Sequence, residues 1–176
     1  MVVGQTIPKT MRYIKKSKLD QSFTILFDTR EQKPWTLPPQ YPMKRVHLKV
    51  GDYTIKGYES IIAIEKKSGL AELFTDLSVS YRPTFKRFLR KLAQFPIKAI
   101  VVQDSLNSGT LHRCLTELNR KSKGKMQMTE ETLYYWVSEI TLKYGIPILF
   151  VDKAILLNIL PRIFEAAFRK AQEMKQ

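Results

Sequence analysis

Short runs of β-forming residues alternate with stretches of helical periodicity, and this alternation restricts the fold more than any other feature of the sequence. The apolar runs "SFTILF" (22–27), "SIIAIEKK" (60–67), "IKAIVV" (97–102) and "IPILFV" (146–151) have the length and composition of buried strands. By contrast, "PTFKRFLRKLAQF" (83–95) carries its apolar residues on one helical face and its basic residues on the other. Strands and helices in this alternation predict an α/β domain with a mixed central sheet flanked by helices.

The segments between these runs complete the expected order of elements. "DYTI" (52–55) and residues 60–67 form a plausible hairpin, and "KRVHLKV" (44–50) alternates like a half-buried strand. A helix that starts after Thr129 and ends at Gly145 has a good N-cap residue, acidic residues in its first turn and a glycine at its end. Further helices are expected over 70–77, within 105–125 and over 153–172. The sequence contains no internal repeat, so we expect a basic N-terminal arm (1–20) followed by one domain (21–176).

The charge balance favours a polyanionic partner. The 176-residue chain has 30 Lys and Arg against 16 Asp and Glu, a formal net charge of +14. Nucleic acid is the leading partner and an anionic membrane surface the weaker one, while a purely solubilising charge is the alternative. The single Cys114 excludes an internal disulfide, and with His47 and His112 it is too few for a four-ligand zinc site. No stretch has membrane-spanning length, and we expect an intracellular protein.

Two basic stretches are candidates for binding DNA phosphates. Such stretches are usually solvated faces, but beside a carboxylate site they favour contacts to a nucleic-acid backbone. The predicted DNA-binding residues are Arg82, Lys86, Arg87, Arg90, Lys91, Lys121, Lys123 and Lys125.

Carboxylates cluster at the expected strand ends. Glu65 and Lys67 point to the same face of their strand because side chains repeat every two residues, and Asp52 lies across the predicted hairpin. Asp28, which ends the first strand, can join them. Carboxylates without a His or Cys cluster suit a hard cation such as Mg²⁺ or Mn²⁺. A lysine beside them can orient a water or offset charge that develops on a phosphate.

Each of these signals has an ordinary structural explanation when it is taken alone. A Glu-x-Lys triplet in a lysine-rich chain is usually a solvated strand end. In "FDTRE", Asp28 can cap the following turn while Arg30 and Glu31 are solvated neighbours. The catalytic interpretation therefore depends on the occurrence of all these residues together.

Together, "FDTRE", "VGDYTI", "IEKKS", the basic helix and "AIVVQDSL" resemble the XPF-type nuclease domain of structure-specific endonucleases. The signature of that family is Gly-Asp, a spacer, Glu-Arg-Lys, three residues and Asp. Gly51, Asp52, Glu65 and Lys67 match it, and Lys66 replaces the arginine with the same charge.

This resemblance implies a restriction-endonuclease-like α/β core and metal-dependent cleavage of branched, flap or fork-like DNA. It implies that Asp28, Asp52 and Glu65 hold Mg²⁺ or Mn²⁺ and that Lys67 supplies the catalytic amine. Glu31 and Arg30 would support them. A homodimer or a separate targeting subunit is a possible partner of such a domain.

The sequence departs from the family at two positions. Ala71 stands where the signature has its last aspartate, with Glu72 one place later, and Gln103 stands where a glutamate is frequent. These departures keep an alternative open, namely a catalytically inactive DNA-binding partner of a nuclease complex. The intact Asp28, Asp52, Glu65 and Lys67 favour the enzyme.

Overall fold

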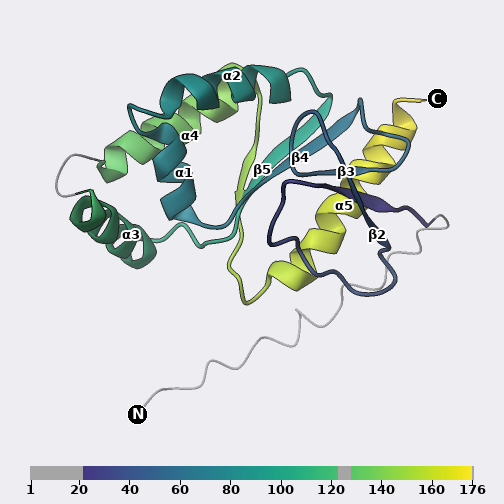
Figure 1. The fold of residues 1–176 in the computed structure, drawn as a ribbon, viewed down its shortest axis with the longest axis horizontal. Coiled ribbons are helices and arrows are strands. Elements are labelled where there is room, and N and C mark those ends of the chain that lie inside the picture. The colour runs from purple at the N-terminus through teal and green to yellow at the C-terminus, as the bar shows by residue number, and fades with distance from the viewer. Residues whose placement is uncertain (1–21, 123–127, 176) are drawn as a thin grey trace, which may run out of the picture.

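A computed structural model describes residues 22–122 and 128–175 (Figure 1). Its elements, in chain order, are β1 (Ile25–Asp28), β2 (Met43–Val46), β3 (Tyr53–Ile55), β4 (Ile62–Lys67), α1 (Leu70–Leu77), α2 (Arg82–Leu92), β5 (Ile97–Val102), α3 (Ser108–Lys121), α4 (Glu130–Tyr144), β6 (Ile148–Phe150) and α5 (Leu156–Glu173).

The strands form one mixed sheet in the order β2-β1-β3-β4-β5-β6. β3 pairs antiparallel with both β1 and β4, while the β1–β2, β4–β5 and β5–β6 pairs are parallel. The predicted α/β class with a mixed central sheet is confirmed.

Helices cover the two faces of the sheet unequally. Helices α1 to α4 pack on one face and form a hydrophobic cluster with Ala63, Ile100 and Val102. On the other face α5 packs in a second cluster that includes Ile62 and Ile64 of β4. Figure 1 shows α1 to α4 gathered at one side of the molecule, while α5 lies beside β2 and β3. β4 thus sends alternate side chains into two cores, which fixes the direction of every residue at its end.

A glycine sets the entry into β3. Gly51 has a φ of 75°, and a Cβ at this position would lie 3.1 Å from the Ile64 carbonyl oxygen. The next residue, Asp52, donates its backbone N–H to that same oxygen at 2.9 Å. Glycine is needed here because only a residue without a side chain accepts both the left-handed conformation and the close approach to β4. The result is that Asp52 is held directly beside the end of β4.

The strand predicted over residues 44–50 is wrong beyond Val46, where β2 ends. The Leu48 backbone N–H donates to Asp28 Oδ2 at 2.6 Å instead of to a neighbouring strand. A buried carboxylate is a strong acceptor, and it draws this segment out of the sheet.

The predicted ends of α4 are confirmed. The Thr129 side chain accepts a hydrogen bond from the Thr132 N–H, and Gly145 closes the helix with a φ of 61°. Pro161 lies inside the single helix α5. Within the part of the chain that is described, no helix is long and apolar enough to cross a membrane. The predicted basic arm (1–20) lies outside the described residues, as do Lys123 and Lys125.

Candidate active site

Asp52 and Glu65 form a pair of carboxyl groups where β3 begins and β4 nears its end. Asp52 precedes β3, and its Oδ2 accepts the Lys66 backbone N–H at 2.8 Å. The carboxyl groups of Asp52 and Glu65 lie beside each other, and each influences the pKa of the other. The predicted convergence of Asp52 and Glu65 across the hairpin is therefore present in the structure.

Burial raises the pKa of both carboxyl groups. For Glu65 the pKa rises to about 8, because burial and the neighbouring Asp52 outweigh the opposing effect of Lys67. For Asp52 burial again is the largest cause, although the Lys66 N–H and Lys67 lower the pKa in part. Two adjacent, partly buried carboxyl groups whose ionisation burial opposes form a site at which a cation can replace a proton.

Lys67 lies beside this pair, with a side chain that is only 8% exposed. Its Nζ lies 2.9 Å from Glu65 Oε1, 2.8 Å from Asp76 Oδ2 and 3.5 Å from Glu72 Oε1. Burial by itself lowers the pKa of the Lys67 amine, but Glu65 and Asp76 outweigh it and raise the pKa. Lys67 is consequently an ammonium ion at neutral pH.

The contact between Asp76 and Lys67 is not evident from strand periodicity. Asp76 belongs to α1, four residues after Glu72, and this spacing places both carboxylates on the same side of the helix. Because α1 starts three residues after β4 ends, that side faces Lys67. The i, i+4 pair of acidic residues was the signal in the sequence that could have revealed this contact.

Asp28 has a different environment at the end of β1. Its Oδ1 accepts the Arg30 backbone N–H and Nε, each at 2.7 Å, and its Oδ2 accepts the Leu48 N–H at 2.6 Å and Arg30 Nη2 at 3.2 Å. Burial raises the pKa of Asp28, but these hydrogen bonds outweigh it and lower the pKa to about 2. The carboxylate is thus a fixed anion whose contacts are with Arg30 and Leu48.

Arg30 and Glu31 link this strand end to the carboxyl pair. Asp28, and more weakly Asp52 and Glu65, raise the pKa of the Arg30 guanidinium, whose side chain is 65% exposed. Glu31 Oε1 lies 3.2 Å from Lys66 Nζ, and Glu31 also raises the pKa of Asp52. The residues of "FDTRE" therefore lie around the carboxyl pair, and none of their contacts described above is with Lys67.

Helix α2 contacts the site through its apolar side and carries basic residues on its other side. On its buried side, the Phe85 ring lies 5.5 Å from Lys67 Nζ. On its outer side, Arg82 Cζ and Lys86 Nζ each lie 4.9 Å from the centre of the Trp136 ring. Arg82, Pro83, Lys86, Arg87, Arg90 and Val79 line a groove of about 390 Å³. Lys91 also belongs to α2, whereas Lys121 belongs to α3 and forms an ion pair with Glu117 at 2.6 Å.

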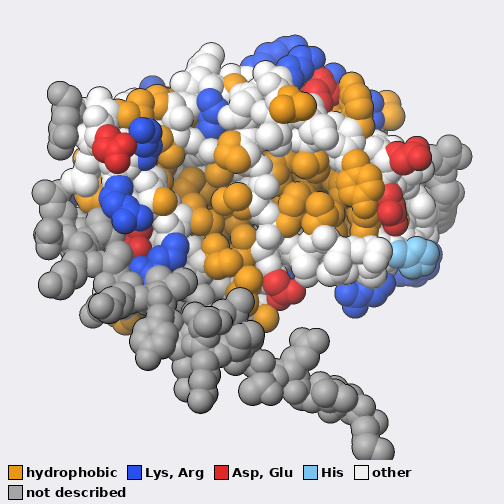
Figure 2. All heavy atoms as spheres, turned by 180° about the vertical axis from the view of Figure 1, so that it is seen from behind, with side chains coloured by type: hydrophobic (Ala, Val, Ile, Leu, Met, Phe, Trp, Pro, Cys, Tyr) orange, Lys and Arg blue, Asp and Glu red, His pale blue; other side chains and the backbone are white. Residues whose placement is uncertain are grey.

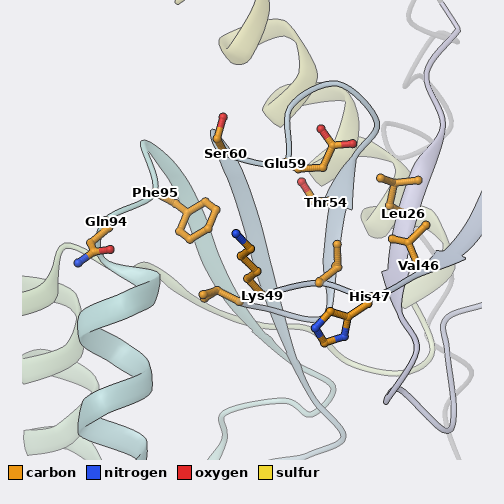
Figure 3. Close-up of a pocket in the computed structure, with 11 residues that line it drawn as sticks. Leu26, Val46, His47, Lys49, Thr54, Glu59, Ser60, Gln94 and Phe95 are labelled. Atoms are coloured by element: carbon orange, nitrogen blue, oxygen red, sulfur yellow. The ribbon is translucent and has the colours of Figure 1, made fainter.

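Two other hollows lie near these elements. Ala71, Glu72 and Asp104 help to line one of about 380 Å³ beside α1. The other, of about 710 Å³, has Gln94 and Phe95 on one side and Leu26 and Val46 on the other (Figure 3). Neither Asp52 nor Glu65 lines the larger hollow, so the carboxyl pair forms a separate site.

Asp52 and Glu65 offer only a small number of oxygen atoms for binding a metal ion. Residues 22–122 and 128–175 contain no group of three or more His, Cys, Asp or Glu placed to hold one ion together. Two adjacent carboxyl groups nevertheless fit a hard divalent cation, which in proteins often keeps several waters.

Comparison with known proteins shows which solved structures have a similar fold. No protein-family model matches the sequence, and no curated protein does. The structure of XPF from Aeropyrum pernix in complex with DNA is similar, with a TM-score of 0.58 and 16% identity over 84% of this chain and 66% of that chain. Another structure of XPF from Aeropyrum pernix gives a TM-score of 0.57 and 16% identity over 86% of this chain and 68% of that one. The XPF-type fold expected from the sequence is confirmed, and this chain spans about two thirds of those XPF chains.

Proposed function

We propose that this protein is a divalent-metal-dependent DNA endonuclease that cleaves branched, flap or fork-like DNA. The observation that carries this proposal is the pair of adjacent, partly buried carboxyl groups of Asp52 and Glu65, beside the ammonium of Lys67. An XPF-type fold and a basic groove on α2 add support, since one of the similar XPF structures is a complex with DNA. A DNA substrate also agrees with the expected intracellular location.

Asp52 and Glu65 would hold Mg²⁺ or Mn²⁺. Their carboxyl groups adjoin each other, burial opposes their ionisation, and carboxylate oxygens are the ligands these ions prefer. Asp28 would have to release Arg30 or Leu48 to become a third ligand, so we assign it to holding Arg30. A bound ion would lower the pKa of a water and offset charge on the attacked phosphate.

The other residues would bind and orient the substrate. The Lys67 ammonium would donate hydrogen bonds to a phosphate oxygen and stabilise charge there, and its protonated state argues against a role as general base. The exposed Arg30 guanidinium would contact a neighbouring phosphate. Arg82, Lys86, Arg87, Arg90, Lys91 and Lys121 would bind the DNA backbone, together with Lys123 and Lys125 beyond the described residues.

The second candidate function is a catalytically inactive DNA-binding subunit of a nuclease complex. Ala71 and Gln103, which replace acidic residues of the family, favour it. The same basic surface would then bind DNA without cleavage.

A cleavage assay separates the two functions. The protein is incubated with end-labelled flap, fork, splayed-arm and linear duplex DNA in Mg²⁺, Mn²⁺ or EDTA, alongside Asp52→Asn. The enzyme hypothesis predicts metal-dependent products from branched DNA that Asp52→Asn loses while its DNA affinity is equal or higher, because a negative charge near the phosphates is gone. DNA binding without cleavage on any of these substrates would favour the inactive subunit.

We also propose that the protein forms a homodimer. Figure 2 shows hydrophobic side chains spread over the middle of one face of the molecule. Large hydrophobic residues that are exposed include Leu142 of α4, and Ile155 and Leu157 near the start of α5. Light scattering should give twice the monomer mass, and Leu142→Glu should reduce it. A monomeric wild-type protein would favour a separate targeting subunit.

A further inference from the structure

We propose that Asp76 is a positioning residue that holds the Lys67 ammonium in place once Glu65 binds a metal ion. The inference rests on the proposed function. Helix α1 would then contribute a residue to the site, although the proposed metal ligands lie in β4 and just before β3.

The geometry places Lys67 between two carboxylates from different elements. Its Nζ lies 2.9 Å from Glu65 Oε1 on its own strand and 2.8 Å from Asp76 Oδ2 on α1. The Lys67 side chain is 8% exposed and that of Asp76 is 26% exposed. The ammonium is therefore held by protein carboxylates with little access to solvent.

A cation on Glu65 would change this balance. The ion and Lys67 would compete for the same carboxylate, and a nearly buried ammonium that loses its partner pays a large desolvation penalty. Asp76 would relieve this competition, because it keeps an anion beside Lys67 while Glu65 binds the metal ion. Without Asp76, Lys67 would hold Glu65 and weaken metal binding.

Glu72, the other carboxylate near Lys67, forms hydrogen bonds with Ser68. Glu72 Oε2 accepts the Ser68 N–H at 2.8 Å and the Ser68 Oγ–H at 2.7 Å, while Glu72 Oε1 lies 3.5 Å from Lys67 Nζ. Its side chain is also more exposed, at 42%. Asp76 is consequently the closer and less solvated of the two acidic partners on α1.

The helix that carries Asp76 is firmly packed. Leu73, Phe74 and Leu77 of α1 are fully buried in the hydrophobic cluster on this face of the sheet. The Phe85 ring of α2 borders Lys67 from another direction at 5.5 Å. A carboxylate on a fixed helix can hold the ammonium in one position, as catalytic groups require.

The test compares Asp76→Asn with a matched control, Glu139→Gln. Glu139 also forms an ion pair, 2.9 Å from Lys143 Nζ, but on α4. For each variant, Mn²⁺ affinity is measured by calorimetry, DNA affinity in EDTA by anisotropy, and the single-turnover rate on the preferred branched DNA. We expect Asp76→Asn to weaken Mn²⁺ binding and the rate about 10- to 100-fold with DNA affinity unchanged. Asp76→Glu should restore part of both losses, and Glu139→Gln should match the wild type.

A second set of variants removes Lys67, the residue through which Asp76 is proposed to act. In a Lys67→Met background, Asp76→Asn should cause no further loss of rate and no loss of Mn²⁺ affinity, because no ammonium remains to compete for Glu65. Equal losses in both backgrounds, or an unchanged Asp76→Asn protein, would overturn the positioning role. If Asp76→Asn does not fold, Asp76→Ser is measured in its place, with the same expected losses. A wild-type protein that neither binds Mn²⁺ nor cleaves would instead overturn the proposed function, and this inference with it.

Discussion

Two neighbouring carboxylate sites in this protein have opposite electrostatics. Asp28 ends β1 and Asp52 precedes β3, and the two are joined by a backbone hydrogen bond from the Asp28 N–H to the Asp52 carbonyl at 2.9 Å. Four hydrogen-bond contacts from Arg30 and Leu48 surround the Asp28 carboxylate, and its pKa falls to about 2 despite burial. Glu65 instead faces Asp52 as well as Lys67, and its pKa rises to about 8.

The two sites differ in how far the hydrogen-bond donors of the protein compensate for burial. Burial is the largest influence at both sites and opposes ionisation at both. The protein supplies enough donors to overcome burial at Asp28 but not at the Asp52–Glu65 pair. Carboxyl groups whose ionisation stays opposed by burial are candidates for binding an external cation, and we propose a divalent metal ion here.

The largest expected effect comes from Glu65→Gln. Cleavage should fall at least about 100-fold, because the proposed metal ion would lose an oxygen ligand. The metal-free variant should nevertheless be as stable as the wild type or more stable, since the contact between two partly buried carboxyl groups is removed. Thermal melts in EDTA and single-turnover assays measure both effects. A variant that is clearly less stable while still active would make Glu65 a structural residue like Asp28.

The adjacent lysines of β4, Lys66 and Lys67, are expected to differ in what their replacement changes. Lys66 lies 3.2 Å from Glu31 and Lys67 contacts Glu65 and Asp76, and both are nearly buried. Lys67→Ala should lower the cleavage rate about 100-fold or more while Mn²⁺ affinity is retained or raised. Lys66→Ala should affect mainly stability. Similar activity losses in folded variants of both lysines would contradict the assignment of the catalytic cation to Lys67.

Asp28→Asn should lower stability by about 2 kcal/mol at neutral pH, in keeping with a pKa lowered from 3.8 to about 2. Because the folded-state pKa is depressed, this stabilisation is complete above about pH 5 and is lost as the pH falls through 4 toward 2. Urea unfolding between pH 7 and pH 2.5 should show the wild type and the variant converging in acid. A constant difference across this range would mean that packing, and not the charge of Asp28, causes the loss.

The smallest expected effect concerns basic residues on the surface, some of which line the groove while others form ion pairs. Arg87 and Arg90 line the basic groove, whereas Lys143 and Lys170 form ion pairs with Glu139 and Glu173. Replacing both arginines with alanine should reduce the slope of log K for DNA against log salt by about two. The double alanine variant of the two lysines is the matched control and should keep the slope. Equal slopes for the two double variants would remove the groove from the DNA interface.

Much of the fold could be predicted from local sequence signals. The apolar run of β4, the amphipathic pattern of α2, and the Thr129 and Gly145 ends of α4 are determined by neighbouring residues, and the structure has them. The early end of β2 could not be predicted in this way. It depends on a hydrogen bond between Leu48 and Asp28, which are 20 residues apart.

The candidate site was predictable only in part. Strand alternation and the hairpin brought Asp52, Glu65 and Lys67 together, because both depend on regular geometry. That the Asp28 carboxylate contacts Arg30 and Leu48, and that Asp76 contacts Lys67, depend on how a loop and a helix pack against the sheet. The XPF signature alone gives no information on such contacts, since they involve residues outside it.

The Mn²⁺ affinities of the wild type, Asp28→Asn and Asp52→Asn distinguish a metal ligand at Asp52 from one at Asp28. Calorimetry at pH 8 on folded, metal-free proteins measures the affinity of each. We predict that the wild type and Asp28→Asn bind Mn²⁺ with affinities within about fivefold, and that Asp52→Asn binds at least about 100-fold more weakly. A wild type that binds no Mn²⁺, or loss of binding in Asp28→Asn while Asp52→Asn binds like the wild type, would contradict this prediction.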